Sequence, residues 1–254
     1  MTADAPRRSR VPIEIRDLWK SYDGNPVLKG ITLDVAAGET LVIVGGSGEG
    51  KSVLIRHVIG LEHADRGTIR LDGLPIDEYL EKPHREKPFR MAMVFQSGAL
   101  LNSLTVAENV SLALREHREA RRDEIRRIVR ECLSEVDMEG TEDKLPAELS
   151  GGMRKRVAIA RALAIDAHVI LYDEPTAELD PLLNEQIGEL VQKIQKQRSP
   201  TQIVVTHNLP LAKQVADHVA MLREGQIVDY RTGEEFWRSD HPHTREFLRA
   251  ARVV

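Results

Sequence analysis

The sequence has almost no cysteine and no long apolar runs, and both scarcities exclude classes of protein. Cys132 is the only cysteine among 254 residues, so no disulfide can form within the chain. The longest apolar stretches, such as 40–44 and 169–172, have the length of strands, whereas a transmembrane helix needs about 20 apolar residues. The N-terminus also lacks the apolar core of a signal peptide. We therefore expect a cytoplasmic protein that does not span a bilayer.

A large excess of charge of either sign is missing too. The chain has 36 Lys and Arg against 40 Asp and Glu, and this net charge of −4 does not favour a nucleic-acid binder. The local exception is segment 1–10, where Arg7, Arg8 and Arg10 lie among small and polar residues. We expect a flexible, solvated tail there, with contact to lipid headgroups as the alternative.

Strands and helices alternate along most of the chain. Apolar or alternating segments predict strands over 13–19, 31–35, 40–44, 67–71, 91–95, 168–172, 202–206, 218–222 and 226–229. Helices are predicted over 51–60, 152–164 and 181–197. From 97 to about 138 the pattern is helical, with a capping box at Thr105 and Glu108 and with Cys132 on the apolar face, where it is expected to pack. The chain is therefore predicted to be an α/β protein with a parallel sheet and an inserted helical lobe.

A glycine-rich segment between the strand 40–44 and the helix 51–60 fits the phosphate-binding pattern G-x-x-x-x-G-K-[ST]. Glycines let backbone N–H groups curl around phosphates, while the following helix directs its positive end at them. Lys51 can reach the β- and γ-phosphates of ATP, and the Ser52 hydroxyl can ligate Mg²⁺. Glu49 is unusual in an anion-binding loop, so we expect its side chain to point outward. The ATP-binding residues predicted here are Gly45, Gly46, Ser47, Gly48, Glu49, Gly50, Lys51, Ser52 and Val53.

Two acids follow the apolar strand over 168–172. Asp173 is expected to hold Mg²⁺ through water, and Glu174 is placed to orient and polarise an attacking water molecule. Together with the phosphate loop, this pair predicts a P-loop NTPase that hydrolyses ATP.

The segment Leu-Ser-Gly-Gly-Met over 149–153 narrows that prediction. It opens the predicted helix 152–164, so Ser150, Gly151 and Gly152, followed by Met153, form a second helix N-terminus that can hold an anion. In this order and position, the segment resembles the signature motif of the ABC ATPase family.

The resemblance covers nearly the whole chain and identifies further positions. Tyr22 matches the aromatic residue that stacks on adenine, and Gln96 matches the glutamine that contacts Mg²⁺ and relays the nucleotide state. Asp180 matches the D-loop aspartate, and His207 matches the switch histidine near the γ-phosphate. The resemblance thus implies a catalytic set of Glu174, His207 and Gln96, and a metal site of Ser52, Gln96 and Asp173.

The resemblance also implies an ABC-type P-loop NTPase fold with an antiparallel β subdomain. A single domain is expected over 11–254: a core with its β subdomain (11–96 and 156–232), a helical signature subdomain (97–155) and a C-terminal tail (233–254). In the family, two subunits pack head-to-tail, so each ATP lies between one subunit's phosphate loop and the other's signature. The resemblance therefore implies a homodimer that moves a membrane permease as its helical lobes swing.

Segments 96–101 and 104–110, in the region that faces the membrane partner in this family, are similar to the ATPases of Mla/Mce lipid-transport systems. Met153 points the same way, because most ABC proteins carry glutamine there. This resemblance implies transport of phospholipid or another hydrophobic substrate. The ATPase is expected on the cytoplasmic face of the inner membrane, with a separate permease, an Mce-domain substrate-binding protein and, in many such systems, a small STAS-domain protein.

Two alternatives to lipid transport stay open. One is an importer of a small solute of the glycine-betaine or amino-acid type, whose ATPases can also carry methionine in the signature. The other is an ABC protein that acts on ribosomes or DNA without a permease. Such proteins typically carry two ATPase cassettes or long coiled-coil inserts, and the sequence has neither.

The C-terminal stretch carries two features. Histidines flank a proline over 240–243, which suggests a metal site, but no third ligand lies nearby and a surface loop fits better. Phe236, Trp237, Phe247 and Leu248 are expected to dock the tail onto the domain body or onto a second subunit.

Overall fold

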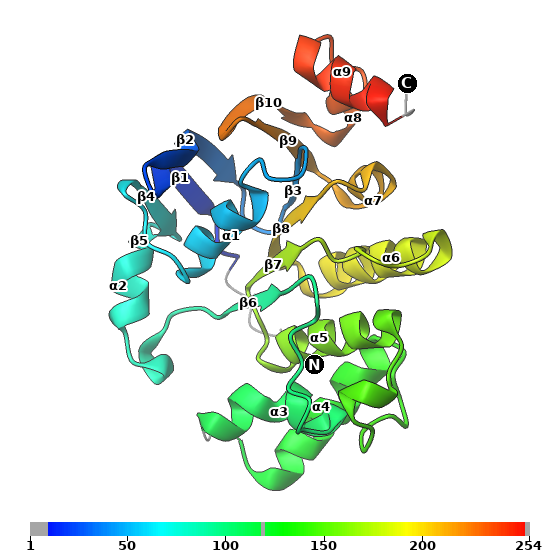
Figure 1. Cartoon of the computed structure of the whole chain (residues 1–254). Coiled ribbons are helices and arrows are strands. Elements are labelled where there is room, and N and C mark those ends of the chain that lie inside the picture. The colour runs from blue at the N-terminus through cyan, green and yellow to red at the C-terminus, as the bar shows by residue number, and fades with distance from the viewer. Residues whose placement is uncertain (1–9, 118–119, 252–254) are drawn as a thin grey trace, which may run out of the picture.

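The computed structural model describes residues 10–117 and 120–251. The predicted N-terminal tail, apart from Arg10, lies outside the described residues. Within those ranges, no helix combines the length and the apolar character needed to cross a membrane. The described chain forms two sheets, with a lobe of helices at one end of the molecule (Figure 1).

The larger sheet has six strands in the order β10-β9-β3-β8-β7-β6. Neighbours from β9 to β6 are parallel, and the β9–β10 pair is antiparallel. The strands are β3 (Thr40–Val44), β6 (Met91–Val94), β7 (Val169–Asp173), β8 (Thr201–Thr206), β9 (His218–Arg223) and β10 (Gln226–Thr232). Parallel pairing puts the carboxyl ends of β3, β8, β7 and β6 at one edge, and the predicted site residues follow these ends.

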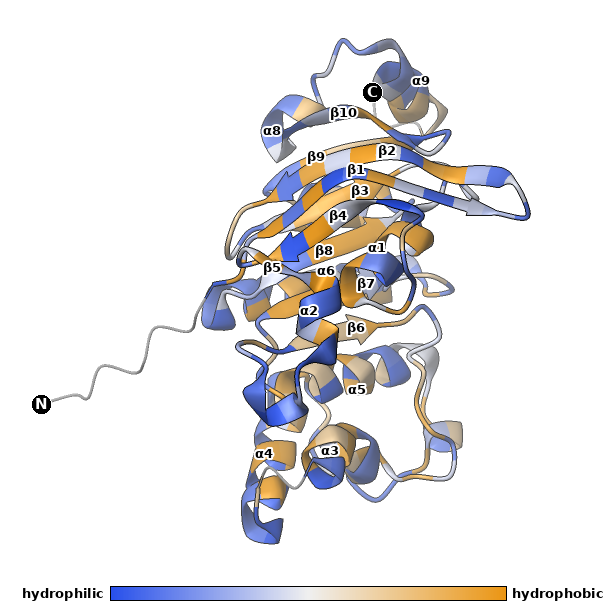
Figure 2. Ribbon diagram, turned by 90° about the vertical axis from the view of Figure 1, so that its left-hand side faces the viewer, coloured by the Kyte–Doolittle hydropathy of each residue, from blue (hydrophilic) through white to orange (hydrophobic). Residues whose placement is uncertain are grey.

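Side chains of the central strands alternate between two hydrophobic cores. On β3, Leu41 and Ile43 enter one core, whereas Val42 and Val44 enter the other. Strands β7 and β8 alternate in the same way, which explains the continuous apolar runs within these segments. Figure 2 shows the resulting concentration of hydrophobic residues on the central strands.

The second sheet is antiparallel and covers one of these cores. Its strands, in the order β2-β1-β4-β5, are β1 (Ile13–Tyr22), β2 (Asn25–Val35), β4 (Arg66–Leu71) and β5 (Leu74–Pro75). Helix α1 (Lys51–Ile59) buries Leu54, Ile55 and Val58 in the same core as Ile13 of this sheet and Ile43 of the larger sheet. Helix α1 therefore lies between the two sheets. Helix α2 (Ile76–Glu81) and the short 3₁₀ helix η1 (His84–Glu86) follow β5.

The helical lobe follows β6. It contains α3 (Val106–Glu116), α4 (Arg122–Glu135), the 3₁₀ helix η2 (Pro146–Glu148) and α5 (Gly151–Ala164). Helices α6 (Pro181–Arg198) and α7 (Leu209–Val215) follow β7 and β8. In α4, Cys132 is buried and burial raises its pKa to about 11, so the prediction that it packs is confirmed.

The prediction of helix from residue 97 onward is wrong for 97–105. Gly98 and Ala99 take positive φ values of 79° and 45°, which a right-handed helix excludes. Helix α3 begins only after Thr105, whose hydroxyl accepts from the Glu108 N–H while the Glu108 carboxylate accepts from the Thr105 N–H, as the capping box predicts.

The C-terminal segment packs on β9 and β10 of the same chain. It comprises α8 (Gly233–Phe236) and α9 (Pro242–Ala250), with Phe236 and Leu248 fully buried. In the histidine-containing stretch, 240–241 form a loop as predicted, whereas 242–243 begin α9, and Nδ1 of His243 lies 2.8 Å from Nη1 of Arg223. Across 10–117 and 120–251, no group of three or more His, Cys, Asp or Glu could hold a metal ion.

Asp229 of β10 anchors this segment. Its carboxylate, 8% exposed, accepts hydrogen bonds from Ser239 Oγ (2.6 Å), Thr244 Oγ1 (2.7 Å) and Arg231 Nε (2.8 Å). Burial acts to raise the pKa of Asp229, but these hydrogen bonds outweigh it and hold the pKa below its usual value. The anion therefore stabilises the folded state at neutral pH, and this contribution is lost as the pH falls through the carboxyl pKa.

Replacing Asp229 by alanine is expected to destabilise the fold by about 2–3 kcal/mol, because three donors lose a charged acceptor. For a chain of this size, that corresponds to a fall in Tm of roughly 4–10 °C, measured by thermal melting at pH 7. Asp240→Ala is the matched control, since its side chain is 89% exposed and makes one ion pair to Arg231. Equal Tm values for the two variants would contradict the anchoring role.

Candidate active site

The phosphate loop joins β3 to α1, and two glycines determine its shape. A Cβ atom on Gly45 would lie 2.3 Å from the carbonyl oxygen of Leu222 in β9, so only glycine fits there. Gly50 takes a φ of 99° as the N-cap of α1, a conformation that other residues rarely adopt. The first turn of α1 contains no acidic residue, so its positive end stays available for an anion.

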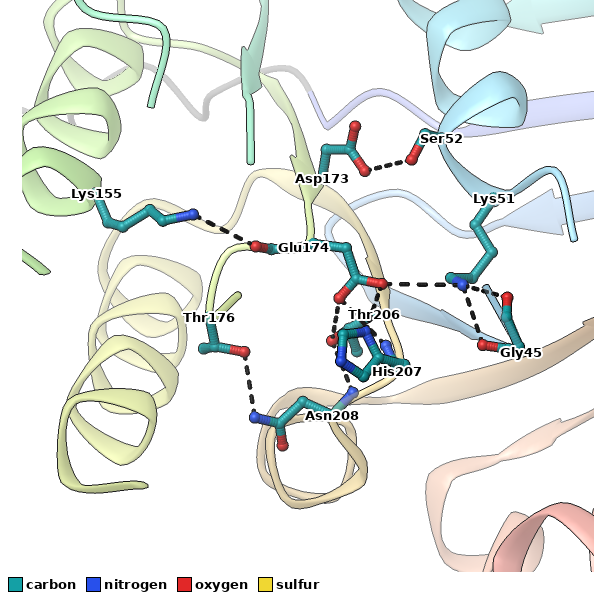
Figure 3. Close-up of polar contacts among 11 residues, drawn as sticks. Gly45, Lys51, Ser52, Lys155, Asp173, Glu174, Thr176, Thr206, His207 and Asn208 are labelled. Atoms are coloured by element: carbon teal, nitrogen blue, oxygen red, sulfur yellow. Dashed lines mark hydrogen bonds and ion pairs between the residues drawn. The ribbon is translucent and has the colours of Figure 1, made fainter. Parts of the chain in front are cut away.

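Lys51 lies across this loop and is 7% exposed. Its Nζ donates to the carbonyl oxygens of Gly45 (3.0 Å) and Gly46 (2.8 Å) and lies 3.8 Å from Oε1 of Glu174 (Figure 3). Burial lowers the pKa of Lys51, while the charge of Glu174 and of two further acids opposes this effect. The loop thus holds a cation between its own carbonyls and the predicted catalytic acid.

The Ser52 hydroxyl donates a hydrogen bond of 2.6 Å to Oδ1 of Asp173 at the end of β7. The predicted metal ligands Ser52 and Asp173 therefore come together, and Asp173 is 5% exposed. A hydroxyl and a carboxylate are hard oxygen donors that suit Mg²⁺, which usually takes only one or two protein groups and completes its octahedron with phosphate and water. The residues present fit Mg²⁺ bound together with a nucleotide.

The Glu174 carboxylate is surrounded by donors from the end of β8. Oε2 accepts from Thr206 Oγ1 (3.1 Å) and from the backbone N–H of His207 (3.2 Å), and Oε1 lies 2.9 Å from Nδ1 of His207 (Figure 3). Glu174 itself takes a φ of 45°, a conformation that costs energy for a residue with a side chain. The structure thus brings Glu174 and His207, predicted separately, into direct contact.

Gln96 follows β6 and is exposed. Within the described residues, its side-chain amide makes no hydrogen bond, so it is free to turn toward a ligand. Gln96 and His207 line one hollow of about 400 Å³ together with the loop after Glu174, including Thr176, Glu178 and Leu179. The predicted catalytic residues therefore share one side of the molecule with this loop.

Glu49 points away from the space that phosphates would occupy. Its Oε2 accepts from the backbone N–H of Glu224, in the tight turn between β9 and β10. The side chain thereby fastens the phosphate loop to that turn. This explains how a carboxylate fits in a predicted anion-binding loop, because the carboxylate accepts a hydrogen bond from the Glu224 backbone.

Tyr22 is the last residue of β1, directly before the turn to β2, and is 39% exposed. Its hydroxyl donates to Glu62, which also accepts from Nη1 of Arg56 at 3.4 Å. Burial and this hydrogen bond raise the pKa of Tyr22 to about 12. The ring is thus held at its rim while a face stays accessible, as stacking on a base requires.

The signature segment begins α5. Ser150 is exposed and caps the helix, because its Oγ accepts from the N–H of Met153 at 3.3 Å. Cβ atoms on Gly151 and Gly152 would lie 3.4 Å from Leu179 and Leu183, an ordinary contact distance, so the D-loop and the first turn of α6 lie beside the start of α5. Asp180 in that loop caps α6, since its Oδ1 accepts from the N–H of Leu183 at 3.0 Å.

The signature and the phosphate loop belong to different parts of the sheet. Helix α5 packs against β6, and three inter-strand steps, on the order of 14 Å, separate β6 from β3. One chain therefore presents the N-termini of α1 and α5 at separate places, and the first turn of each helix contains no acidic residue.

Three polar residues at this site escaped the sequence interpretation. The strand order explains why Thr206 lies at the site: β8 neighbours β7, so Thr206 at the end of β8 lies near the end of β7. Asn208 caps α7 and donates to Thr176 Oγ1 at 3.2 Å. The third residue, Lys155, is 5% exposed. The sequence feature that could have identified it is its place as a lone lysine in the buried stripe of α5.

A family model described as "ABC transporter" matches residues 28–177. The chain is 40% identical over 243 residues to "Probable ribonucleotide transport ATP-binding protein mkl" of Mycobacterium leprae, covering 96% of this chain and 70% of that protein. It is 38% identical to "Probable amino-acid import ATP-binding protein YxeO" of Bacillus subtilis, covering 93% and 96%. It is 35% identical to "Protein TRIGALACTOSYLDIACYLGLYCEROL 3, chloroplastic" of Arabidopsis thaliana, covering 94% and 74%.

Two solved structures are similar to this one. The dimeric post-hydrolysis structure of the ATP-binding cassette MJ0796 with ADP and Pi has a TM-score of 0.77 and 29% identity, covering 87% of this chain and 98% of that one. The structure of cbiO1 from Clostridium perfringens, part of a complex called an ABC transporter, has a TM-score of 0.80 and 30% identity, covering 96% and 98%.

Gly45→Ala is expected to weaken ATP binding strongly, because its Cβ cannot fit beside the Leu222 carbonyl and the loop must shift. Gly46→Ala, one residue further on, is the matched control: its Cβ meets only the Glu49 side chain at 3.5 Å or more. The dissociation constants of a fluorescent ATP analogue for the two variants provide the measurement. Equal affinities would show that the close approach of β9 does not shape the loop.

Proposed function

The chain belongs to the ABC transporter family as an ATP-binding and ATP-hydrolysing domain, and from this premise we propose that it energises the movement of phospholipid or another hydrophobic substrate between membranes. The domain binds ATP with Mg²⁺ and works as a dimer with membrane permease subunits, as the family does. The finer assignments below, to residues, substrate and partners, are our proposals.

We assign nucleotide binding in one subunit to Tyr22 and to the loop from Gly45 to Val53. Lys51 neutralises the β- and γ-phosphates, and Ser52, Asp173 and Gln96 hold Mg²⁺, which supplies Lewis-acid stabilisation of the phosphate oxygens. Support comes from the short contact of Ser52 with Asp173 and from the free amide of Gln96.

We assign orientation of the attacking water to Glu174 and stabilisation near the γ-phosphate to His207. In the structure, three donors and Lys51 already engage the Glu174 carboxylate. For Glu174 to accept a proton from water, it must release one of these contacts. The most exposed contact is that with the His207 ring, which is 61% exposed, so turning of this ring is the natural first step.

The signature residues Ser150, Gly151 and Gly152, with Met153, are proposed to meet ATP bound to the second subunit. Their separation from the phosphate loop of the same chain supports this, as does the exposed, acid-free N-terminus of α5. Asp180 lies beside them in the D-loop and is proposed to contact the partner subunit there.

The lipid assignment depends most on segment 96–101 and on how it is displayed. Asn109, fully buried, bonds the backbone of Leu101, Leu104 and Thr105, and Arg161 donates to the carbonyls of Gly98 and Ala99. The Ser-Gly-Ala-Leu-Leu run that resembles lipid-transport ATPases is thus a rigid surface loop. The Arabidopsis relative is named after a galactolipid, trigalactosyldiacylglycerol, and this name is in keeping with a lipid substrate.

The proposed assembly is a homodimer of this chain on the cytoplasmic face of the inner membrane. Its proposed partners are permease subunits, an Mce-domain substrate-binding protein and a small STAS-domain protein. The second candidate function is energising an importer of small solutes, which the 38% identity to a protein named for amino-acid import favours.

Glu174→Gln is expected to bind ATP, to lose nearly all hydrolysis and to accumulate closed dimers, because the amide cannot accept the water proton. The expected loss in kcat is on the order of 10²- to 10⁴-fold. ATPase assays and size-exclusion chromatography with ATP measure both effects. A Glu174→Gln variant with wild-type turnover would remove Glu174 from its proposed role.

The substrate class is tested by isolating the tagged chain in mild detergent from its native membrane and identifying the co-purifying proteins and lipids. A permease with an Mce-domain protein and phospholipid is the expected result. A permease with a small-solute-binding protein would overturn the lipid assignment but keep the ATPase.

The contact with the permease is tested by two variants. Leu101→Glu, which charges a 47% exposed leucine of the loop, should release the permease, whereas Leu145→Glu, 41% exposed on the same lobe, should retain it.

A further inference from the structure

A buried lysine joins the helical lobe to the active site. Lys155, in the second turn of α5, is 5% exposed. Its Nζ donates to the backbone carbonyl of Gln96 at the end of β6 and lies 3.5 Å from the backbone carbonyl of Glu174 at the end of β7. Figure 3 shows the side chain reaching from α5 to Glu174. One ammonium group thus touches the backbone of both predicted catalytic residues that follow these strands.

This arrangement requires an explanation, because burying an ammonium group is costly. Within the described residues, Lys155 makes no ion pair, and its neighbours are carbonyl oxygens. Burial lowers the pKa of Lys155, and the charges of Glu178, Asp173 and Glu174 act against that shift. An apolar residue would fill the same place in the stripe of α5 without this cost, so packing alone does not account for the lysine.

Through these two contacts, Lys155 joins two loops to the α5 helix. The loops are proposed to face the nucleotide of their own subunit, whereas the signature at the start of α5 is proposed to meet the nucleotide of the partner subunit. Gln96 and Glu174 follow the neighbouring parallel strands β6 and β7, and both are proposed above to act on the nucleotide of their own subunit. Ser150, Gly151 and Gly152 begin the same α5 helix that carries Lys155. A displacement of α5 along its axis therefore moves Lys155 and pulls on both carbonyls at once.

The rest of α5 holds the Gln96 segment at further points. Arg161 donates to the carbonyls of Ala99 (2.8 Å) and Gly98 (3.1 Å), and a Cβ on Gly98 would lie 3.3 Å from the Arg154 carbonyl. The segment 96–99 is thus fixed to α5 along its length. Only Lys155, however, continues the connection to Glu174.

We propose that Lys155 is a positioning residue that couples the signature helix to the catalytic site of its own subunit, by holding the backbone of Gln96 and Glu174 in one arrangement relative to α5. This inference rests on the roles proposed above for Gln96, Glu174 and the signature. When the signature contacts ATP on the partner subunit, α5 then fixes the position of the Glu174 carboxylate in this subunit. Lys155 itself touches no reacting atom.

The test compares three variants in the full chain. Lys155→Met keeps the length and burial of the side chain but removes its donors, and it should lower kcat on the order of 10- to 100-fold, because small displacements of a catalytic group cost that much. ATP affinity should be unchanged, since the phosphate loop is untouched, and the Hill coefficient for ATP should fall toward 1. Lys155→Gln, whose amide donates two hydrogen bonds, should recover part of the lost kcat and cooperativity.

Arg156→Met is the matched control, because Arg156 is the next cation on α5 and its contacts stay away from the site. It donates to the Val136 carbonyl (2.9 Å), to Asp137 (2.8 Å) and to Gln186 (3.1 Å). Its kcat and Hill coefficient should be those of the wild type. In hydrogen exchange, Lys155→Met should exchange faster than wild type at amides 96–99 and 174–177, with α4 unchanged.

The outcomes separate this inference from the proposed function. Wild-type kcat and cooperativity in Lys155→Met, alongside an inactive Glu174→Gln, would overturn the role of Lys155 alone. Equal loss in Lys155→Met and Arg156→Met, or faster exchange throughout the chain, would also overturn it, because that marks general loosening of the lobe. Normal hydrolysis by Glu174→Gln would instead refute the proposed catalytic role on which the inference rests.

Discussion

The arrangement of this molecule depends on the parallel alignment of β3, β8, β7 and β6. Because their carboxyl ends emerge at one edge, residues far apart in sequence become neighbours: the phosphate loop, His207, Glu174 and Gln96. The strand order also determines which of these residues are in contact. Strands β7 and β8 are adjacent, so Glu174 meets Thr206 and His207, whereas β3 and β6 are separated and Gln96 stays apart from the phosphate loop.

The same alignment produces a conflict that the site must resolve during turnover. Glu174 is the carboxylate proposed to activate water, yet it is already bound by Thr206, by His207 and, at 3.8 Å, by Lys51. A carboxylate that is already engaged by these donors must release one of them before it can accept a proton from water. In the roles proposed for Lys51 and His207, phosphates compete for both groups, so nucleotide binding rearranges these contacts. The site is thus held in a resting arrangement by the groups that are proposed to act on ATP.

Much of this architecture could be predicted from the sequence. The apolar β3, β7 and β8 and the glycine-rich loop carry strong local patterns, and the fold class and ATPase activity follow from them. Segment 97–105 could not be predicted as a loop, because the carbonyls of Gly98 and Ala99 are held by Arg161, which is distant in sequence. Side-chain links such as Glu49 to the Glu224 backbone, or Lys155 to Gln96, also require the tertiary structure. They join segments more than 50 residues apart through groups that have no periodic signal.

The alternation of β3, β7 and β8 between two cores has a consequence for motion. Buried residues of the helical lobe, such as Val110 and Leu133, belong to the same continuous core as Val42 and Ile170 of the sheet. Among the described residues, the lobe has no separate interior that could swing away as an independent body. Any rotation of the lobe against the sheet must therefore proceed as shear, with packed side chains sliding past one another in small steps, and not as a hinge that opens the core to water.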